Sequence, residues 1–268
     1  MGKVALCVFL FFYSVNLLAG PENSYDCLVE PWKRVEISFD DTGLIEHIGV
    51  ARSQRVEKGQ ELARLESGVE QATVELRKSK AAMNEAVSLA SANLQFARRN
   101  LARIEGLYNK KAVPFSVFDE AKTEVLVSEQ QLKTAENNKH LATLDLAIAR
   151  QGLQRRTVVS PIDGVVVKLI RSEGEYVKDE PIMLLEQLSL LRVKVLLPVS
   201  EFSKISVGEA AAVSLQEPMN GVERDAKVVM VDRGIDVASG TFGVHLELVN
   251  DDFSIPSGLK CHVKFQGS

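Results

Sequence analysis

The feature that most constrains the fold is an apolar repeat of seven residues in the middle of the chain. It runs from residue 69 to 108 and again from 118 to 153, and the short segment between the two runs contains Pro114. A seven-residue repeat sustained over this length is typical of helices that supercoil around one another. The sequence therefore predicts two long helices, joined by a tight turn, that form an antiparallel hairpin over residues 67–157.

The repeat also predicts which side chains meet inside the hairpin. The first helix would contribute Val69, Leu76, Met83, Ala90, Ala97 and Ile104, with Thr73, Lys80, Val87, Leu94, Leu101 and Tyr108. The second helix would contribute Phe118, Val125, Leu132, Lys139, Leu146 and Leu153, with Ala121, Ser128, Ala135, Ala142 and Ala149. Helices of roughly 40 residues would be about 60 Å long. A rod of this length cannot pack on a small domain throughout, so much of it must project, and a projecting rod usually meets a partner.

Polar residues indicate where the helices begin and end. Ser67 with Glu70, and Ser116 with Asp119, have the spacing of capping boxes, whose side chains satisfy free amides of the first turn. Arg155 and Arg156 close the second helix, where positive charge complements the helix dipole. We expect both on a solvated face, and the alternative is pairing between protomers.

A short β motif occurs twice, once on each side of the predicted helices. Gly43 and Gly164 are each followed thirteen residues later by a valine, and alternating apolar segments surround both. Alternation of this kind, with glycine at the turns, indicates strands. A repeat divided by a helical insertion predicts two half-domains, residues 42–66 and 158–189, that close on each other when the hairpin folds back.

The rest of the chain has the pattern of β structure. Several short strands at this spacing predict a small barrel or sandwich, to which residues 24–41 and 190–267 would belong. The predicted class is α+β, with a split β domain, an inserted helical hairpin and a small β domain. Candidate strands after residue 189 are Arg192–Leu197, Ala211–Leu215, Ala226–Val231, Thr241–Val249 and Leu259–Phe265.

The first residues have the order of a secretory signal peptide. Lys3 precedes the apolar run 4–18, and two small residues follow the run. The run is shorter than the roughly 20 residues that span a bilayer. We expect residues 1–20 to be a cleaved signal that exports a soluble protein from the cytosol. Because Leu17 fits a cleavage site poorly, the alternative is an uncleaved membrane anchor formed by residues 4–20.

Removal of the signal would leave two cysteines, Cys27 and Cys261. Cys261 lies in an alternating segment that turns it toward an apolar face, and Cys27 precedes another such segment. An exported protein permits disulfides, so the two could pair if the first and last strands are neighbours. For so long a loop the chain-entropy model gives a stabilisation of about 5 kcal/mol. The alternative is two buried free thiols.

Composition and motifs exclude several classes of function. A net charge of −4 offers no basic excess for binding nucleic acid. The four histidines are far apart in sequence, and three cysteines are too few for a four-thiolate zinc site. Paired carboxylates, a nucleophile elbow and a phosphate-binding loop are all missing from the sequence. We therefore expect no enzymatic activity, no cofactor and no metal.

The order of these parts resembles the periplasmic adaptor, or membrane fusion protein, family (HlyD-like). The resemblance is carried by Gly43–Glu66, by the second half-motif around Ser160–Val166, and by residues 231–259. It implies a split lipoyl-like domain, the hairpin and a small β-barrel. It also implies a periplasmic efflux subunit that forms a homo-oligomeric ring, a hexamer, between an inner-membrane transporter and a TolC-like outer-membrane channel. The transporter could be of the resistance-nodulation-division or the ABC class.

Two departures from the family pattern concern the β regions. Ser53 stands where the family often has glycine before a turn. The sequence also ends soon after the barrel segment, so we expect the additional membrane-proximal domain of many drug-efflux adaptors to be absent. That expectation weakens the case for a resistance-nodulation-division transporter.

A third departure concerns the hairpin tip, where the family carries an Arg-x3-Leu-x6-Ser pattern for channel contact. Arg103 and Leu107 match this pattern, whereas Pro114 stands at the serine position and Ser116 lies two residues later. The resemblance implies a partner-binding tip formed by these residues and Val113. An efflux adaptor is the leading hypothesis. The alternative is a soluble periplasmic binding or regulatory module that acts on a transporter without forming a tube, which the altered tip favours.

Overall fold

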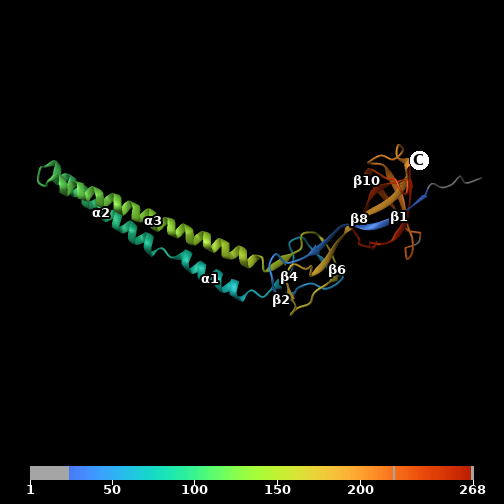
Figure 1. The fold of residues 1–268 in the computed structure, drawn as a ribbon, viewed down its shortest axis with the longest axis horizontal. Coiled ribbons are helices and arrows are strands. Elements are labelled where there is room, and N and C mark those ends of the chain that lie inside the picture. Colours follow the sequence, from blue (N-terminus) through green and yellow to red (C-terminus); the bar gives the residue numbers. More distant parts are fainter. Residues whose placement is uncertain (1–23, 220, 267–268) are drawn as a thin grey trace, which may run out of the picture. The chain divides into compact units, whose positions relative to one another are not determined.

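The computed structural model describes residues 24–219 and 221–266 (Figure 1). The predicted signal peptide lies outside the described residues. The chain divides into two compact units, one formed by residues 34–186 and the other by the residues up to 33 together with those from 187 onward. Strands β1 (Ser24–Ile37) and β8 (Met183–Pro198) contribute residues to both units.

In the first of these units, the two copies of the β motif fold into one domain. Each copy supplies a strand to the other, because β7 pairs antiparallel with β2 and β3 pairs antiparallel with β6. The predicted closure of two half-domains is therefore confirmed. The strands are β2 (Gly43–Ile48), β3 (Arg55–Val56), β4 (Glu61–Leu65), β5 (Thr157–Val159), β6 (Gly164–Leu169), β7 (Tyr176–Val177) and the first part of β8.

Equivalent backbone positions make equivalent hydrogen bonds between the copies. The amide of Ser53 donates to the carbonyl of Val166 at 2.7 Å, and the amide of Gly174 donates to the carbonyl of Ile45 at 2.9 Å. Ser53 and Gly174 both have positive φ, 67° and 82°. This left-handed conformation suits glycine and strains other residues, which accounts physically for a glycine preference at the position of Ser53.

Apolar residues from both copies fill one core inside this domain. The alternation of the strands turns these side chains inward, as the sequence pattern predicts. Because both copies contribute, neither half could bury its apolar face without the other. The buried members are Ile37, Phe39, Ile45, Val50, Val56, Leu62, Ala63, Leu65, Val166, Val177, Ile182, Met183 and Leu185.

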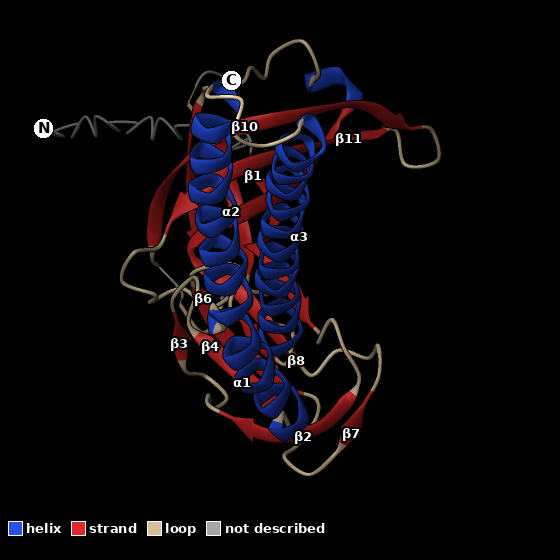
Figure 2. Ribbon diagram, turned by 90° about the vertical axis from the view of Figure 1, so that its left-hand side faces the viewer, coloured by secondary structure: helices blue, strands red, loops and turns tan. Residues whose placement is uncertain are grey.

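The helical hairpin leaves this domain after β4 and returns at β5 (Figure 1). Its first arm consists of α1 (Gly68–Ala82) and α2 (Glu85–Asn109), and its second arm is α3 (Phe115–Gln154). Figure 2 shows the two arms lying side by side. The helical hairpin is thus confirmed, but the prediction of one continuous first helix is wrong.

The first arm is interrupted at Met83 and Asn84. Met83 has an extended backbone with ψ 129°, and Asn84 caps the start of α2. The side-chain amide oxygen of Asn84 accepts a hydrogen bond from Lys139 Nζ of the opposite arm. Lys139 interrupts the apolar repeat of α3, so a polar contact joins the two arms at the break between α1 and α2.

The interruption changes which side chains of the first arm face α3. The predicted seam, meaning the residues of the apolar repeat that face the opposite arm, is confirmed for α2 and α3. Its members are the less exposed residues of those helices. On α1 the prediction is wrong, because Val69 and Leu76 are exposed. Residues that leave the helical conformation shift the phase of the helix beyond them, so the repeat of α2 does not continue into α1. The less exposed residues of α1 are Glu70, Val74, Arg77 and Ala81.

Neither predicted capping box forms. Ser67 does precede α1, but its side chain makes no capping hydrogen bond and instead accepts one from Gln71 Nε2 at 2.9 Å. The second helix begins at Phe115 with Pro114 at the N-cap, so Ser116 already lies inside the first turn. Proline fixes its own φ near the helical value and therefore starts a helix without a polar cap.

The other unit is a closed β structure. Its strand order is β1-β12-β9-β10-β11-β8, and an additional β1–β8 pairing closes it into the small barrel. The candidate strands from the sequence are confirmed, although β8 and β10 are longer than predicted. The remaining elements are β9 (Ala210–Leu215), β10 (Glu223–Asp236), β11 (Thr241–Val249), β12 (Lys260–Phe265) and the short helix η1 (Val199–Glu201).

Candidate functional site

The hairpin leaves many large apolar side chains uncovered. Among its described helical residues only Ala90, Leu94, Ala97, Ala121 and Ser128 are buried. A solvated coiled coil normally carries polar residues on its outer faces, so this amount of exposed apolar surface is unusual for a helical hairpin that stands alone. On the helices they are Val69, Leu76, Leu89, Phe96, Leu107, Phe115, Leu126, Val127, Leu141, Leu144 and Ile148.

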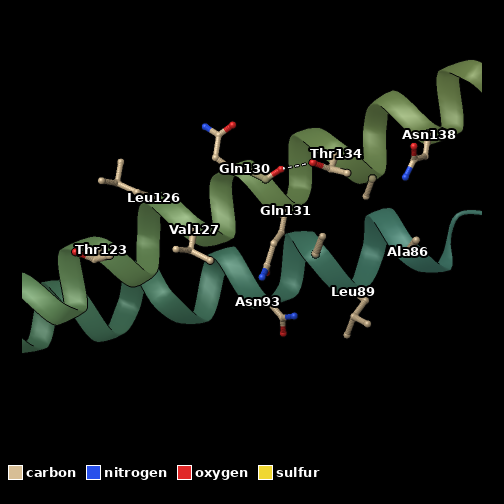
Figure 3. Close-up of a pocket in the computed structure, with 12 residues that line it drawn as sticks. Ala86, Leu89, Asn93, Thr123, Leu126, Val127, Gln130, Gln131, Thr134 and Asn138 are labelled. Carbon is tan, nitrogen blue, oxygen red and sulfur yellow. Dashed lines mark hydrogen bonds between the residues drawn. The ribbon is translucent and has the colours of Figure 1, made fainter.

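A shallow groove of about 700 Å³ runs between α2 and α3 on one side of the hairpin. All of its lining residues are uncharged, and Leu89, Leu126 and Val127 are among them. Figure 3 shows Gln131 of α3 reaching toward α2, whereas Leu126 points away from α2. An open and uncharged groove of this kind suits another apolar surface better than a charged ligand.

Ion pairs connect the two arms on their exposed sides. Arg98 of α2 lies 2.7 Å from Glu129 of α3, and Arg77 of α1 lies 3.3 Å from Asp145 of α3. Exposed pairs of this kind contribute little to stability. Their contribution is to the register between the arms, because each joins a fixed position of one helix to a fixed position of the other.

Arg156 joins the base of the hairpin to the split β domain. Its guanidinium donates to Glu70 Oε1 at 2.5 Å and to the carbonyl of Thr42 at 2.8 Å, and lies 3.7 Å from Asp41. Its side chain is only 18% exposed. The prediction of a solvated face is therefore wrong, and Glu70 binds this arginine instead of capping α1. A two-sided contact of this kind fixes the direction in which the hairpin leaves the domain.

The turn at the hairpin tip is closed by backbone hydrogen bonds. The amide of Lys111 donates to the carbonyl of Tyr108 at 2.7 Å, and the amide of Ala112 donates to the carbonyl of Leu107 at 3.0 Å. Lys111 has φ 59°. This is the Schellman arrangement that ends many helices, formed here with a lysine at the position where glycine is usual.

Three aromatic rings gather beside this turn, a feature that the sequence analysis missed. The rings of Tyr108 and Phe118 stack with centroids 5.0 Å apart and planes 9° from parallel. The ring of Phe115 lies 6.2 Å from Tyr108 and 6.3 Å from Phe118. The heptad repeat predicts only the positions of Tyr108 and Phe118 between the helices, and the signal for the cluster is Phe115, an aromatic residue next to the turn.

The tip residues implied by the family pattern all lie at this end of the hairpin. Arg103 and Leu107 lie in the last two turns of α2, and the Arg103 guanidinium donates to Asn100 Oδ1 at 2.7 Å. Val113 is half-buried in the turn, Pro114 caps α3, and Ser116 is exposed in the first turn of α3. Their role in partner binding stays a prediction.

Cys27 and Cys261 stand opposite each other on neighbouring strands of the barrel. They form a register pair of β1 and β12, with Cα atoms 4.9 Å apart and sulfur atoms 2.14 Å apart. Both side chains are buried. This arrangement supports the proposed disulfide between the first and last strands of the chain.

Glu173 connects the two copies of the β motif. Its Oε1 accepts a hydrogen bond from the amide of Ile48 at 2.8 Å and lies 2.8 Å from His47 Nδ1. The hydrogen bond from the Ile48 amide, followed by the one from His47, lowers the pKa of Glu173 below its ordinary value of 4.5. These hydrogen bonds therefore favour the carboxylate form of Glu173.

No group of three or more histidine, cysteine, aspartate or glutamate side chains in residues 24–219 and 221–266 could hold a metal ion. Among the helices formed by these residues, none is both long and apolar enough to cross a membrane.

Known proteins resemble this chain in sequence and in fold, although no family model matches it. Macrolide export protein MacA of Escherichia coli O157:H7 is 26% identical over 208 residues, which are 74% of this chain and 55% of that protein. The chain spans about half the length of the curated relatives that it matches, 52–55%.

Two solved structures share the fold. The crystal structure of MacA from Actinobacillus actinomycetemcomitans matches with a TM-score of 0.77 and 22% identity, over 90% of this chain and 77% of that one. The membrane fusion protein Spr0693 from Streptococcus pneumoniae R6 matches with a TM-score of 0.65 and 17% identity, over 91% of this chain and 99% of that one. The resemblance to membrane fusion proteins is confirmed by these likenesses, and the fold is theirs.

Proposed function

We propose that this chain is a periplasmic adaptor subunit of an efflux system. In this proposal it is exported by residues 1–20, forms a homo-oligomeric ring, and links an inner-membrane transporter to an outer-membrane channel. The fold of a named membrane fusion protein and the sequence similarity to a named macrolide export protein support the proposal. Because the chain spans only about half of that relative, its partners and its substrate are part of the proposal.

The observation that carries the proposal is the uncovered apolar surface of the hairpin. Leu89 of α2 and Ile148 of α3 are 65% and 70% exposed, and they lie on different arms. Hairpins that stand side by side in a ring would bury such residues of one copy against the next, as partner helices do in other coiled coils. A hairpin that stayed alone would keep them in contact with water at a cost of about 25 cal/mol per Å².

The base of the hairpin fits a mechanical role. Arg156 binds residues of α1 and of the split β domain at once, so a rotation of that domain would be transmitted to the hairpin direction. An adaptor needs such a connection, because it must convert a change at the transporter into a movement at the far end of the rod. The adaptor would then act by positioning the transporter and the channel and by sealing the conduit between them.

Charged substitutions on the two arms test side-by-side assembly. We expect Leu89→Glu and Ile148→Glu to convert rings into monomers in sedimentation velocity, because a carboxylate cannot enter the apolar contact without a large desolvation penalty. Asn137→Glu adds the same charge at an exposed polar position of α3 and should leave the rings intact. Wild-type protein that sediments only as a compact monomer under all conditions would contradict the proposal.

The regulatory alternative is separated by crosslinking in the cell. A photoreactive residue at Leu107 should capture an outer-membrane channel if the chain is an adaptor. A regulatory module that acts on a transporter alone would give no such product. The observation that favours the regulatory alternative is the altered tip pattern, in which Pro114 stands at the serine position.

A further inference from the structure

We propose that Phe115 is the anchoring side chain of the hairpin tip, and that it enters an apolar socket on the partner protein. In this proposal Lys110 and Lys111 pair with carboxylates around that socket. The inference rests on the proposed function, in which the partner is the periplasmic end of an outer-membrane channel. It adds a side chain outside the Arg103 and Leu107 pattern, and it adds the chemistry of the surface that this side chain contacts.

Phe115 is exposed yet held in place. Its side chain is 61% exposed, while its ring packs on Tyr108 and Phe118 at 6.2 and 6.3 Å. Tyr108 and Phe118 stack on each other and form a rigid support that does not depend on Phe115. A ring that is already ordered loses little conformational freedom on binding, which is the property of aromatic hot-spot residues.

The backbone on both sides of Phe115 is also fixed. Pro114 precedes it at the N-cap of α3 with φ −72°, and the Schellman hydrogen bonds close the turn just before. Phe115 is therefore the first residue of a 40-residue helix, positioned by a restrained turn. The ring is presented at the end of the hairpin in one direction instead of moving with a flexible loop.

The charge around Phe115 indicates the chemistry of the partner. Lys110 and Lys111 are exposed, and neither forms an ion pair with any residue that the structure describes. Residues 106–118 contain no aspartate or glutamate, and the exposed carboxylates of Glu105, Asp119 and Glu120 border this segment. The N-terminus of α3 adds the positive end of a helix dipole at the same place. A complementary surface would carry carboxylates around an apolar depression.

Photocrosslinking of the full chain in its own host tests the proposal. A benzoylphenylalanine probe replaces Phe115 and, in a matched control, Phe96, which is the same residue type at 65% exposure on the side of α2. We expect position 115 to yield an adduct with an outer-membrane channel, at a peptide that contains aspartate or glutamate. Position 96 should yield no channel adduct. An adduct of position 115 with a second copy or a soluble protein, or no adduct at all, would overturn the proposal.

Substitutions then measure how much the anchor contributes. With the probe moved to Leu107, Phe115→Ala should lower the yield of channel adduct by about tenfold or more, as truncation of a hot-spot ring does, while Phe115→Leu keeps most of it. Lys110→Glu with Lys111→Glu should also lower the yield, and the paired arginine variants should not. Unchanged yields for Phe115→Ala and for the charge reversal would contradict the inference. Thermal melting of Phe115→Ala should stay close to wild type, because the ring is mostly exposed.

The same experiments separate this inference from the proposed function. If the Leu107 probe captures the channel and Phe115→Ala has no effect, the anchor is wrong and the adaptor role stands. If rings form but neither position 107 nor position 115 captures a membrane protein, the adaptor role fails together with the anchor.

Discussion

The split β domain buries its large apolar side chains, whereas the helical hairpin leaves many of its own exposed. In the β domain, side chains from two distant segments close around one core, and residues such as Leu62 and Leu185 have no exposed surface. In the hairpin, α1 has no buried residue, and large side chains such as Ile148 face outward. The β domain thus buries its apolar core within one chain, whereas the hairpin leaves large apolar side chains exposed, and this exposure is what the proposed assembly would cover.

The strongest test of the self-contained β regions is the pairing of Cys27 with Cys261. Replacing both by alanine should lower the free energy of unfolding of the barrel unit by about 5 kcal/mol, because the bridge closes a loop of more than 200 residues in the unfolded chain. Urea denaturation followed by circular dichroism measures the loss. Wild-type protein treated with a reductant should unfold at the same lower urea concentration. A change below about 1 kcal/mol would contradict the predicted stabilisation by the bridge.

A second test compares the same substitution in the two regions. Leu185→Ala should cost about 2–5 kcal/mol, because it opens a cavity in a closed core. Leu141→Ala, at a side chain that is 58% exposed on α3, should cost less than about 0.5 kcal/mol in the monomer. Urea unfolding midpoints at a protein concentration too low for assembly give both values. Similar losses at the two sites would remove the distinction between the regions.

The parts of the fold that the sequence predicts are those with a strict periodicity. The thirteen-residue spacing from Gly43 and from Gly164 predicts the closure of two half-domains, and the seam of α3 follows its repeat throughout. The break at Met83 and Asn84 could not be predicted, because Met83 continues the repeat and neither residue is a glycine or proline. A local departure of this kind depends on contacts from the other arm, such as that of Lys139 with Asn84.

The candidate site was predictable to a smaller extent. The position of the tip follows from Pro114, which lies between the two repeats. The predicted capping boxes do not form, because Glu70 binds Arg156 and because α3 begins after Pro114 without a polar capping residue. The contacts of Arg156 have no sequence signal, since its partners Glu70, Thr42 and Asp41 come from segments far away in the chain. The exposure of apolar side chains along the two arms could not be predicted either, because a heptad pattern describes the seam and says little about the opposite faces.

A third test uses the internal repeat of the β domain as its own control. Ser53→Gly should stabilise the protein by about 1 kcal/mol, and Gly174→Ser should destabilise it by about the same amount, since both positions have positive φ. A Cβ atom added at Gly174 would have no heavy atom within 4 Å apart from its chain neighbours, so the effect arises from the backbone conformation. Thermal melting of both variants measures the changes. Effects of the same sign at the two positions would contradict the equivalence of the copies.

The smallest expected effect is the pH dependence of stability that arises from Glu173, which connects the two copies of the β motif. The pKa of Glu173 is lowered in the folded protein by hydrogen bonds from the Ile48 amide and from His47. A group whose folded pKa lies below its unfolded value stabilises the protein above the unfolded value, and the stabilisation is lost as the pH falls through that value toward the folded pKa.

Wild type should therefore melt at a higher temperature than Glu173→Gln at pH 6–7, and the difference should shrink as the pH falls below about 4.5. Glu105→Gln removes an exposed carboxylate of α2 that forms no ion pair with the described residues, and it should leave the pH dependence unchanged. Melting curves between pH 3 and 7 decide the outcome. A constant difference between wild type and Glu173→Gln over this range would show that the ionised carboxylate of Glu173 does not stabilise the folded protein. Any change of the melting temperature with pH would then arise from groups other than Glu173.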